Sequence, residues 1–424
     1  MRILFYSISY SPENAGSGRY NGELTEWLAA RGHQVDVITA HPYYPEWRVH
    51  ESYRGKGWCT ERRGNLTVYR SPLYVPREVT GRSRILHELS FAATSLVHGV
   101  RCLFRKYDVV IGMCPPLLAG AFPYLFGRFR GVPFLFHVQD LQVDAARQLG
   151  MIRNQRLLNA LDGVEKFLLQ KADAVSSISE GMKRNILAKG VRPERYFMLP
   201  NWADTDFIRP LPPDESLRTE LGIAPHEKVV LYSGNMGEKQ GLEVILDAAA
   251  LLTDVPNLRI LLCGEGAARR RLVADAQSRG LHNVLFSPIR PYEQLPKVLA
   301  TGDVHLVILK KSTSDLVMPS KLVSTLAAGG AAIVSAEPGT TLREVVENND
   351  FGWAIEPESP AALAEAIREA VLSERLPTLR KNARLYAENC LSRTAILSKA
   401  EVFLHQLARK EPLVQNNSEK VTIS

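Results

Sequence analysis

Glycine and lysine residues in the second half of the chain stand where they can hold a phosphate group. Gly234, Asn235 and Gly237 follow the apolar run 229–233, and Lys239 comes just before a helix-like segment. Glycine lets the backbone approach a diphosphate closely, and a lysine can offset the negative charge that grows on a departing diphosphate. A tight turn without a ligand is the alternative, but the neighbouring motifs favour a binding turn.

A second candidate phosphate motif occupies residues 315–335, DLVMPSKLVSTLAAGGAAIVS. Pro319 suits the first turn of a helix, where no N–H group is needed. The N–H groups of Ser320, Lys321 and Leu322 would then be free to meet phosphate, and the Lys321 ammonium would add direct charge pairing. An ordinary helix that starts at proline and ends at glycine is the structural alternative.

Two shorter glycine turns support the same interpretation. Gly264 belongs to a Gly-Glu-Gly turn after a strand-like run, and we expect it to line a nucleotide. Gly16 and Gly18 lie at the start of the helical stretch 17–30, which Ser17 can cap. The N-terminus of that helix is expected to face a ligand. Turns that serve only the fold are the alternative for both.

Polar side chains end a buried strand in the first half of the chain. His137, Gln139 and Asp140 follow the apolar residues FLF, at the carboxyl end of the strand, where open α/β sheets place ligands. Strand alternation puts His137 and Gln139 on one side and Asp140 on the other. Hydroxyl-rich sugars need such donors and acceptors, although a histidine at a strand end is often a hydrogen-bonded core residue.

An aromatic loop lies in the same half of the chain. The segment HPYYPEW contains His41, Tyr43, Tyr44 and Trp47. Aromatic faces stack on the C–H surfaces of sugars, so these four residues are candidates for binding an acceptor sugar. Packing of the rings within the loop is the alternative.

Short apolar runs alternate with helical patterns along the chain, seven runs in the first half and six in the second. This alternation predicts parallel sheets covered by helices. The proline-rich segment 201–215 is expected to link a Rossmann-like domain over residues 1–200 to another over residues 216–375. A closing helix over 376–410 and a disordered tail over 411–424 complete the prediction.

Composition places the chain among soluble globular proteins. Its 424 residues are 45% hydrophobic and 23% charged, and no apolar run reaches the roughly 18–20 residues that a membrane-spanning helix needs. The N-terminus lacks the pattern of a secretory signal. Five cysteines without a metal or redox spacing predict reduced thiols and a cytoplasmic protein.

Basic residues gather in one part of the first half. Arginine and lysine outnumber acidic residues between Arg77 and Arg130, in a chain of net charge +7. The segment 81–107 has basic ends and an apolar stripe, so it can lie in the interface of an anionic membrane. Burial of the same stripe in the core is the alternative. A peripheral position on the inner face of the plasma membrane is therefore one expectation.

Together, these motifs resemble the family 4 retaining glycosyltransferases of the GT-B fold, over residues 1–410. More narrowly, the strings YSISYSPENAGSGRYNGEL, FHVQDLQVDA, LYSGNMGEKQGLE and VMPSKLVSTLAAGG are similar to those of colanic acid fucosyltransferases. The resemblance implies an α/β protein with two Rossmann-like domains facing across a cleft. It also implies a C-terminal helix that crosses back to the first domain.

The resemblance further implies an activity. A sugar would move from a nucleoside diphosphate donor with its anomeric configuration kept. The implied donor is GDP-fucose, and the implied acceptor is a lipid-linked exopolysaccharide unit. The donor would lie against the second domain and the acceptor against the first. His137, Lys239 and Lys321 are the expected catalytic residues, and no cofactor, metal or nucleic acid is expected.

The chain departs from the broad family at two places. The second glycine turn begins Gly-Asn and ends Gln-Gly, where the family often has Gly-Arg and Lys-Gly. The family also carries two glutamates separated by seven residues, and the matching positions here are Leu316 and Ser324. The second glutamate usually holds the ribose, so Ser324 must do so differently or be replaced. Asp315 is one candidate for the lost first acid.

Two other functions are compatible with these residues. One is a non-hydrolysing sugar-nucleotide epimerase on the same architecture, which would change a donor with no acceptor present. The other is a non-catalytic module that binds a sugar nucleotide, because an acid of the family pattern is missing.

Overall fold

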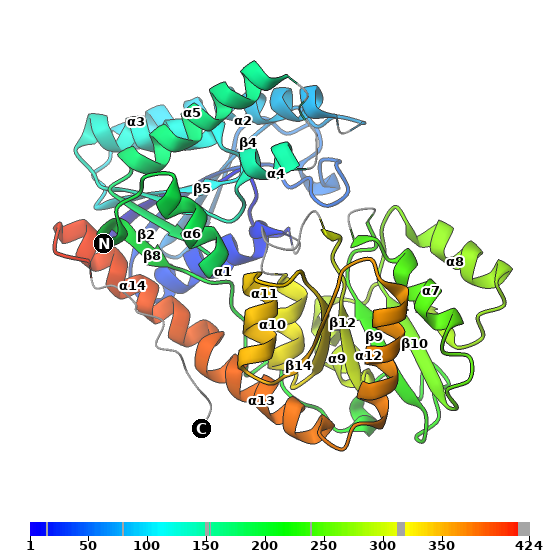
Figure 1. Cartoon of the computed structure of the whole chain (residues 1–424). Helices are drawn as coiled ribbons and strands as arrows, with labels where there is room; N and C mark the ends of the chain where they lie inside the picture. Colours follow the sequence, from blue (N-terminus) through cyan, green and yellow to red (C-terminus); the bar gives the residue numbers. More distant parts are fainter. Residues whose placement is uncertain are drawn as a thin grey trace. The chain divides into compact units, whose positions relative to one another are not determined.

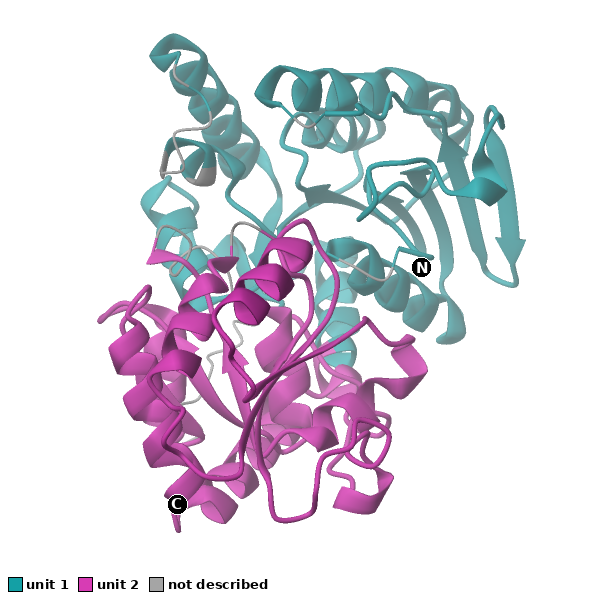
Figure 2. Cartoon of the chain, turned by 90° about the vertical axis from the view of Figure 1, so that its right-hand side faces the viewer, with its two compact units in different colours: residues 1–200, 397–417 teal, residues 201–396, 418–424 magenta. Residues whose placement is uncertain are grey.

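The computed structural model of the chain describes residues 1–13, 16–78, 80–148, 152, 154–237, 240–311 and 319–413. The chain forms two compact units (Figure 2). Unit 1 contains Met1–Pro200 and Leu397–Asn417, and unit 2 consists mainly of Asn201–Ile396.

Unit 1 is built on an eight-stranded sheet in the order β3-β4-β2-β1-β5-β6-β7-β8 (Figure 1). Neighbouring strands are parallel, except for the antiparallel pair β3–β4 at the edge. The strands are β1 (Arg2–Tyr6), β2 (Gln34–Ala40), β3 (Cys59–Arg63), β4 (Leu66–Ser71), β5 (Val109–Cys114), β6 (Phe134–Val138), β7 (Ala174–Ser177) and β8 (Tyr196–Met198).

Helices cover both faces of this sheet. They are α1 (Ser17–Ala30), α2 (Gly81–Leu103), α3 (Ala121–Arg130), α4 (Gln142–Gln148), α5 (Gln155–Lys171), α6 (Glu180–Ala188) and the later part of α14 (Arg393–Arg409). Phe403 of α14 stacks on Phe197 of β8, with the ring centroids 4.2 Å apart. The expected return of the C-terminal helix to the first domain is thus present. None of the described helices is both long and apolar enough to span a lipid bilayer.

The run FLFHV of β6 shows why the sheet is buried on both sides. Phe134 and Phe136 pack into a core with residues of α5 and α6. Leu135 and His137 point the other way, toward a small cavity lined by residues of α1 and α14. Because side chains alternate along a strand, an uninterrupted apolar run is what a sheet covered on both faces requires.

Unit 2 contains a parallel six-stranded sheet in the order β11-β10-β9-β12-β13-β14. Its strands are β9 (Lys228–Ser233), β10 (Leu258–Cys263), β11 (Val284–Ser287), β12 (Val304–Val307), β13 (Ala331–Ser335) and β14 (Gly352–Ile355). Its helices are α7 (Glu243–Ala250), α8 (Arg269–Ser278), α9 (Leu295–Thr301), α10 (Ser320–Ala327), α11 (Thr341–Asn348), α12 (Pro360–Leu372) and α13 (Leu376–Cys390). Two large apolar clusters, one on each face, form its core.

Strand order reverses at one point in each sheet. In unit 1, β1 has β2 on one side and β5 on the other; in unit 2, β9 has β10 on one side and β12 on the other. Open α/β sheets bind ligands at the carboxyl ends of the strands beside such a reversal. This edge carries the turn before α1 in unit 1. In unit 2 it carries the turn after β9 and the start of α10.

The closing segment differs from the single helix expected over 376–410, because α13 and α14 are separate helices. The residues between the two helices form backbone hydrogen bonds with Ala203, which lies in the distant segment 201–215. The Ala203 N–H donates to the Leu391 carbonyl, and the Ala203 carbonyl accepts from the Arg393 N–H, both at 2.9 Å. These bonds replace the i→i−4 bonds of a continuous helix.

The segment 201–215, expected to be a linker, belongs to unit 2. Ala203 and Ile208 are completely buried in one of the core clusters of that unit. A proline-rich composition is therefore compatible with a segment that packs against a domain as well as with a flexible linker.

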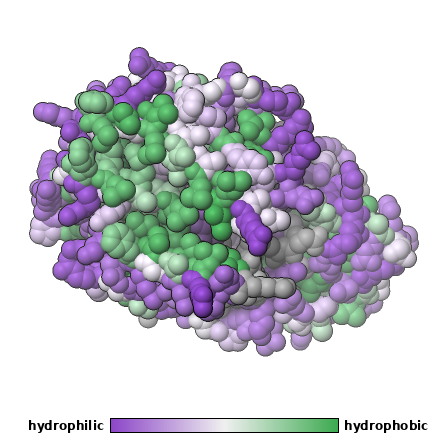
Figure 3. Space-filling view, turned by 90° about the horizontal axis from the view of Figure 1, so that it is seen from above, coloured by the Kyte–Doolittle hydropathy of each residue, from purple (hydrophilic) through white to green (hydrophobic). Residues whose placement is uncertain are grey.

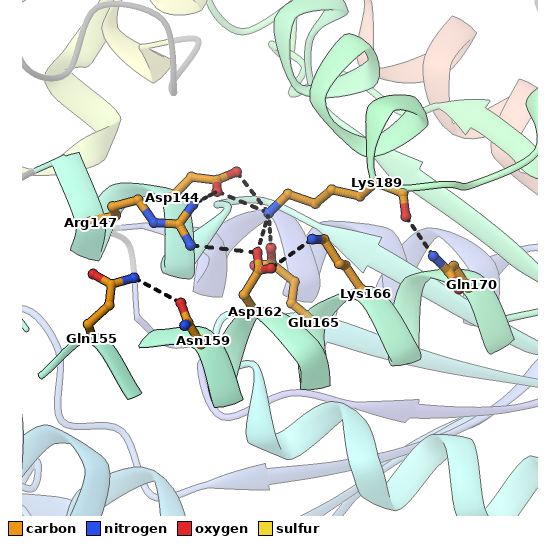
Figure 4. A network of polar contacts seen from close by, with 9 residues as sticks. All are labelled: Asp144, Arg147, Gln155, Asn159, Asp162, Glu165, Lys166, Gln170 and Lys189. Carbon is orange, nitrogen blue, oxygen red and sulfur yellow. Dashed lines mark hydrogen bonds and ion pairs between the residues drawn. The ribbon is translucent and has the colours of Figure 1, made fainter. Parts of the chain in front are cut away.

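A network of charged side chains holds α4 against α5 (Figure 4). Lys189, which caps the C-terminus of α6, lies 2.9 Å from Asp144 of α4 and contacts Glu165 of α5. Glu165 is only 2% exposed. Burial raises the pKa of the Glu165 carboxyl, although Lys189 opposes that rise. The lysine therefore compensates a carboxylate that could not stay charged alone.

Two further cations complete the network. Lys166 lies 2.8 Å from Asp162, and Arg147 reaches Asp144 and Asp162 at 3.9 Å. Three carboxylates thus meet three cations, which fixes the helix that follows the end of β6.

We expect Lys189→Met to destabilise unit 1 by about 3 kcal/mol, because it leaves Glu165 buried without a counter-charge. Urea unfolding followed by circular dichroism would measure the change. Lys166→Met is the matched control, since Lys166 is half exposed and its ion pair should contribute less than about 1 kcal/mol. Equal losses in the two variants would contradict a special role of Lys189.

Candidate functional site

Two glycine turns of unit 2 meet at the carboxyl ends of β9 and β10. A Cβ atom at Gly264 would lie 1.9 Å from the Gly234 carbonyl oxygen, so only glycine allows this approach. The Met236 N–H donates to the Glu265 carbonyl at 2.8 Å. The two turns, separate in the sequence, therefore form one backbone surface.

Lys321 extends from the start of α10 into this surface. Its ammonium lies 3.8 Å from the centroid of the Tyr232 ring and donates a hydrogen bond to the Tyr232 hydroxyl. A Cβ atom at Gly234 would be 2.8 Å from the Lys321 Cε, so the glycine makes room for the lysine. Tyr232 in turn donates to the Asn235 carbonyl at 2.6 Å. One tyrosine thus joins the lysine to the turn.

No carboxylate pairs with Lys321 among the described residues of the chain. Its side chain is partly buried, and loss of water around the ammonium lowers its pKa to about 7. The ring of Tyr232 provides a cation–π contact, which is weaker than an ion pair in a desolvated place. A ligand with negative charge would supply the missing counter-ion.

The start of α10 agrees in part with the expectation. Pro319 precedes the helix and no side chain caps it, and its first turn holds no acidic residue. Ser320 is the first helical residue, and Ser324 lies one turn later on the same face, partly exposed. The prediction was wrong for Leu322, whose N–H already donates to the Pro319 carbonyl at 3.0 Å. A tight first turn consumes that donor.

Two predicted residues of this region, Lys239 and Asp315, lie outside the described residues. Gly237 is described, and a Cβ atom there would be 2.9 Å from the Gln240 Oε1 and 3.2 Å from the Asn235 Nδ2. Within unit 2, the structure brings together Gly234, Asn235, Gly237, Gly264, Pro319, Ser320 and Lys321 at one edge of the sheet. The sequence analysis missed Tyr232, although its place two positions before the glycine turn at Gly234 was a signal in the sequence.

In unit 1, Gly16 and Gly18 stand at the start of α1. Gly16 is the N-cap with φ of 62°, a left-handed conformation that favours glycine. Ser17 is the first helical residue rather than the cap, and no side chain caps the helix. The N-cap of α1 therefore offers no side-chain acceptor to the first N–H groups of the helix, as at an anion-binding helix start.

Glu13 connects this turn to the aromatic loop and was missed in the sequence. Its Oε1 accepts hydrogen bonds from the N–H groups of Tyr43 and Tyr44, at 2.8 and 3.0 Å. Its Oε2 lies against Gly18 and accepts no hydrogen bond from a described residue. Burial raises the pKa of the Glu13 carboxyl to about 7. The sequence signal that could have indicated Glu13 was a single acidic residue close to the glycines Gly16 and Gly18.

The aromatic loop is packed more than it is exposed. His41 is buried and its Nε2 donates to the Gly57 carbonyl at 3.0 Å. Tyr43 is buried against Trp47 and against His87 of α2, at centroid distances of 5.6 and 4.5 Å. Tyr44 and Trp47 remain partly exposed. Of the four predicted residues, these two therefore offer the most surface to a ligand.

His137 is enclosed in the structure. It is 2% exposed, its Nδ1 contacts the Ser176 hydroxyl at 2.8 Å, and its Nε2 contacts the Gln139 amide at 3.0 Å. Burial lowers the pKa of the imidazole to about 3, so the ring is neutral. Contact between Nε2 and a sugar would require Gln139 to turn away. Gln139 and Asp140 are partly exposed at the end of β6.

Two groups of side chains have the spacing of metal ligands among the described residues. Asp144, Asp162 and Glu165 already surround Lys189. His33, Glu401 and His405 form the other group. There Arg31 pairs with Glu401, and the N-terminal ammonium lies 3.1 Å from His33. Cations close to both groups oppose metal binding.

Comparison with known proteins gives the family of both halves. Residues 15–202 match the family described as Glycosyl transferase 4-like domain, and residues 213–389 match Glycosyl transferases group 1. The chain is 41% identical, over 404 residues, to a relative from Escherichia coli (strain K12) assigned as the colanic acid biosynthesis glycosyl transferase WcaI. The match covers 94% of this chain and 98% of that protein.

Solved structures of the same fold exist. The chain is similar to sucrose-phosphate synthase from Thermosynechococcus elongatus, with a TM-score of 0.76, 20% identity and coverage of 97% and 100%. It is also similar to Anabaena HepE in complex with UDP-glucose, with a TM-score of 0.70, 18% identity and coverage of 96% and 100%. At these identities the likeness shows the fold, which is GT-B.

Binding of a nucleoside diphosphate ester at Lys321 is expected to take up a proton. Near pH 6 the ammonium is already charged, so uptake is small. With a pKa of about 7 in the empty site, uptake should be about half a proton at pH 7 and near one at pH 8. Affinity should therefore fall by up to about tenfold per pH unit above pH 7.

Calorimetry in buffers of different ionisation enthalpy measures this uptake. Lys321→Arg is the control, because its guanidinium stays charged across this range. A wild-type protein that binds the ester without proton uptake at pH 8 would show that Lys321 does not meet the diphosphate.

Proposed function

Because the chain belongs to the family 4 glycosyltransferases of the GT-B fold, we propose that unit 2 binds the diphosphate of a nucleotide sugar. Lys321 supplies the positive charge, and the glycine turns after β9 and β10 supply backbone that the phosphates can approach. The single observation that carries the proposal is a lysine, at the point where the strand order reverses, that pairs with no carboxylate of the residues the structure describes.

The reaction we propose keeps the anomeric configuration. The bond between the sugar C1 and the diphosphate oxygen breaks, and an acceptor hydroxyl bonds to C1 from the same face. The hydroxyl proton passes to the departing diphosphate. Lys321, Lys239 and the start of α10 offset the charge that grows on the leaving group. Tyr44, Trp47, Gln139 and Asp140 of unit 1 bind the acceptor.

The donor we propose is GDP-fucose, and the acceptor is a lipid-linked exopolysaccharide intermediate of the colanic acid type. The similarity to WcaI, a colanic acid biosynthesis glycosyl transferase, over nearly the whole of both chains supports the colanic acid part of this proposal. Thermal shifts with GDP-, UDP-, dTDP- and ADP-sugars test the donor, since a ligand that binds the native state raises its stability. Conversion of a donor in the absence of any acceptor would instead indicate an epimerase.

An apolar stripe on unit 1 supports a membrane-bound acceptor. Along the outer face of α2, Leu86, Leu89, Leu96 and Val100 are 47–54% exposed. Leu125 and Phe129 of α3 add to the same face, where Figure 3 shows hydrophobic residues gathered. An exposed helix with this pattern suits the interface of a bilayer. We propose that unit 1 rests there, on the inner face of the plasma membrane.

Lys321→Met should lower glycosyl transfer by at least about 100-fold, because it removes a charge from the leaving diphosphate. Release of nucleoside diphosphate from the donor identified above would measure the rate. Lys297→Met, an exposed lysine of α9, is the matched control and should leave the rate unchanged. Transfer by Lys321→Met within threefold of wild type would refute the role of Lys321.

Replacing Leu89 and Leu96 together by serine should weaken binding to lipid vesicles at least about tenfold, because less apolar surface enters the bilayer. Vesicle co-sedimentation would measure it. Serine at Leu251 and Leu372, which are exposed on unit 2, is the matched control. If only the control variant loses vesicle binding, the surface that contacts the membrane lies on unit 2 and not on α2.

A further inference from the structure

An open pocket of about 540 Å³ lies between the edge hairpin of unit 1 and the C-terminal end of α2. Thr60 and Arg62 of β3, Tyr69 of β4, Arg101 of α2 and Arg105 line it. Three of its five residues are arginines. The pocket plays no part in the site at the carboxyl ends of the strands.

One of the arginines is fixed in place. Arg105 pairs with both oxygens of the Asp36 carboxylate, at 3.0 and 3.1 Å, and Tyr107 donates to the same carboxylate at 2.7 Å. The Arg105 guanidinium lies 5.8 Å from the centroid of the Tyr69 ring. Asp36 neutralises this arginine, which therefore forms an ordered wall rather than a free charge.

The guanidinium groups of the other two arginines are not paired with a described carboxylate. Arg62 and Arg101 are exposed, and neither side chain has a hydrogen bond or an ion pair with a described residue. The end of α2 contributes about half a negative charge through its free carbonyls. Two full positive charges outweigh it, so the pocket attracts an anion. Guanidinium groups bind phosphate through paired hydrogen bonds.

The pocket also adjoins the apolar stripe. Val97 and Val100 of α2 and its C-cap residue Phe104 lie within about one turn of Arg101, and they are 41%, 54% and 86% exposed. If that stripe enters the acyl region of a bilayer, Arg101 and the pocket stand beside it at the level of the headgroups. Apolar contact and phosphate contact would then occur in the same orientation of unit 1.

We propose that this three-arginine pocket binds the phosphate of an anionic phospholipid headgroup. The inference rests on the proposed membrane position of unit 1 and adds a defined lipid subsite to it. Arg62 and Arg101 hold the phosphate, while Arg105 and Tyr69 shape the pocket. Anionic lipid would thereby fix which way α2 faces, not only whether unit 1 binds.

The test compares vesicles of phosphatidylcholine alone with vesicles that also contain phosphatidylglycerol. The wild-type protein should prefer the anionic vesicles. The double variant Arg62→Ala with Arg101→Ala should bind them about 10- to 30-fold more weakly, at about 1 kcal/mol per basic residue. Its binding to neutral vesicles should not change, because the apolar stripe is intact. The double lysine variant keeps the charge but loses paired hydrogen bonds, so it should fall between the two.

The matched control is Arg192→Ala with Arg195→Ala, which removes the same charge near β8, at the opposite edge of the sheet. Equal losses in the two double alanine variants would overturn the pocket and leave only general attraction to anionic lipid. Retained preference in Arg62→Ala with Arg101→Ala would also overturn it. Binding of glycerol phosphate that is lost in Arg62→Ala with Arg101→Ala, together with no preference of the wild-type protein for anionic vesicles, would point to a soluble phosphate ligand and overturn the lipid source.

Sugar transfer to a soluble acceptor separates this inference from the proposed function. We expect Arg62→Ala with Arg101→Ala to transfer at the wild-type rate, because neither arginine is among the residues proposed to bind the donor or the acceptor. If the wild-type protein transfers sugar but shows no preference for anionic vesicles, the lipid pocket is refuted and the proposed function stands. If the wild-type protein transfers no sugar, the proposed function is refuted instead.

Discussion

The candidate donor site depends on how closely two pieces of backbone pass each other. Gly264 lies against the carbonyl of Gly234, at a separation that leaves no space for a side chain. This contact fixes the turn after β9, and the turn in turn leaves room for the alkyl chain of Lys321. The ammonium then ends over Tyr232 with no carboxylate from the described chain to neutralise it. Backbone packing, rather than an ion pair, therefore sets the position of the charge.

Unit 1 holds its candidate ligand-binding loops by different means. The Glu13 carboxylate joins the turn before α1 to the backbone of Tyr43 and Tyr44. The ion-pair network around Lys189 fixes α4, which follows the polar residues at the end of β6. Both devices use buried charge, which is costly to leave without a partner. The loops are thus held by interactions that tolerate little movement.

The elements with a clear apolar period could be predicted from the sequence. Helix α1 has the expected bounds, and strand β9 contains the apolar run 229–233, because their apolar residues follow the period of a helix and of a buried strand. Strand β3 was missed because CTERR is polar and lies at the edge of the sheet. The break between α13 and α14 depends on Ala203, almost 190 residues away, which no local pattern reveals. The same limit applies to Tyr232 and Lys321, which are 89 residues apart.

Helix α14 has a consequence for how the protein is made. Its residues from Leu397 onward cover part of one face of the first sheet, beside α1, and the strands of that sheet end before residue 200. During synthesis on the ribosome, this part of the face stays exposed until the residues of α14 have emerged. A gene fragment that stops at residue 200 would yield a polypeptide with the same uncovered surface. Chaperone dependence and poor solubility of such fragments follow from the order of translation rather than from any weakness of the sheet.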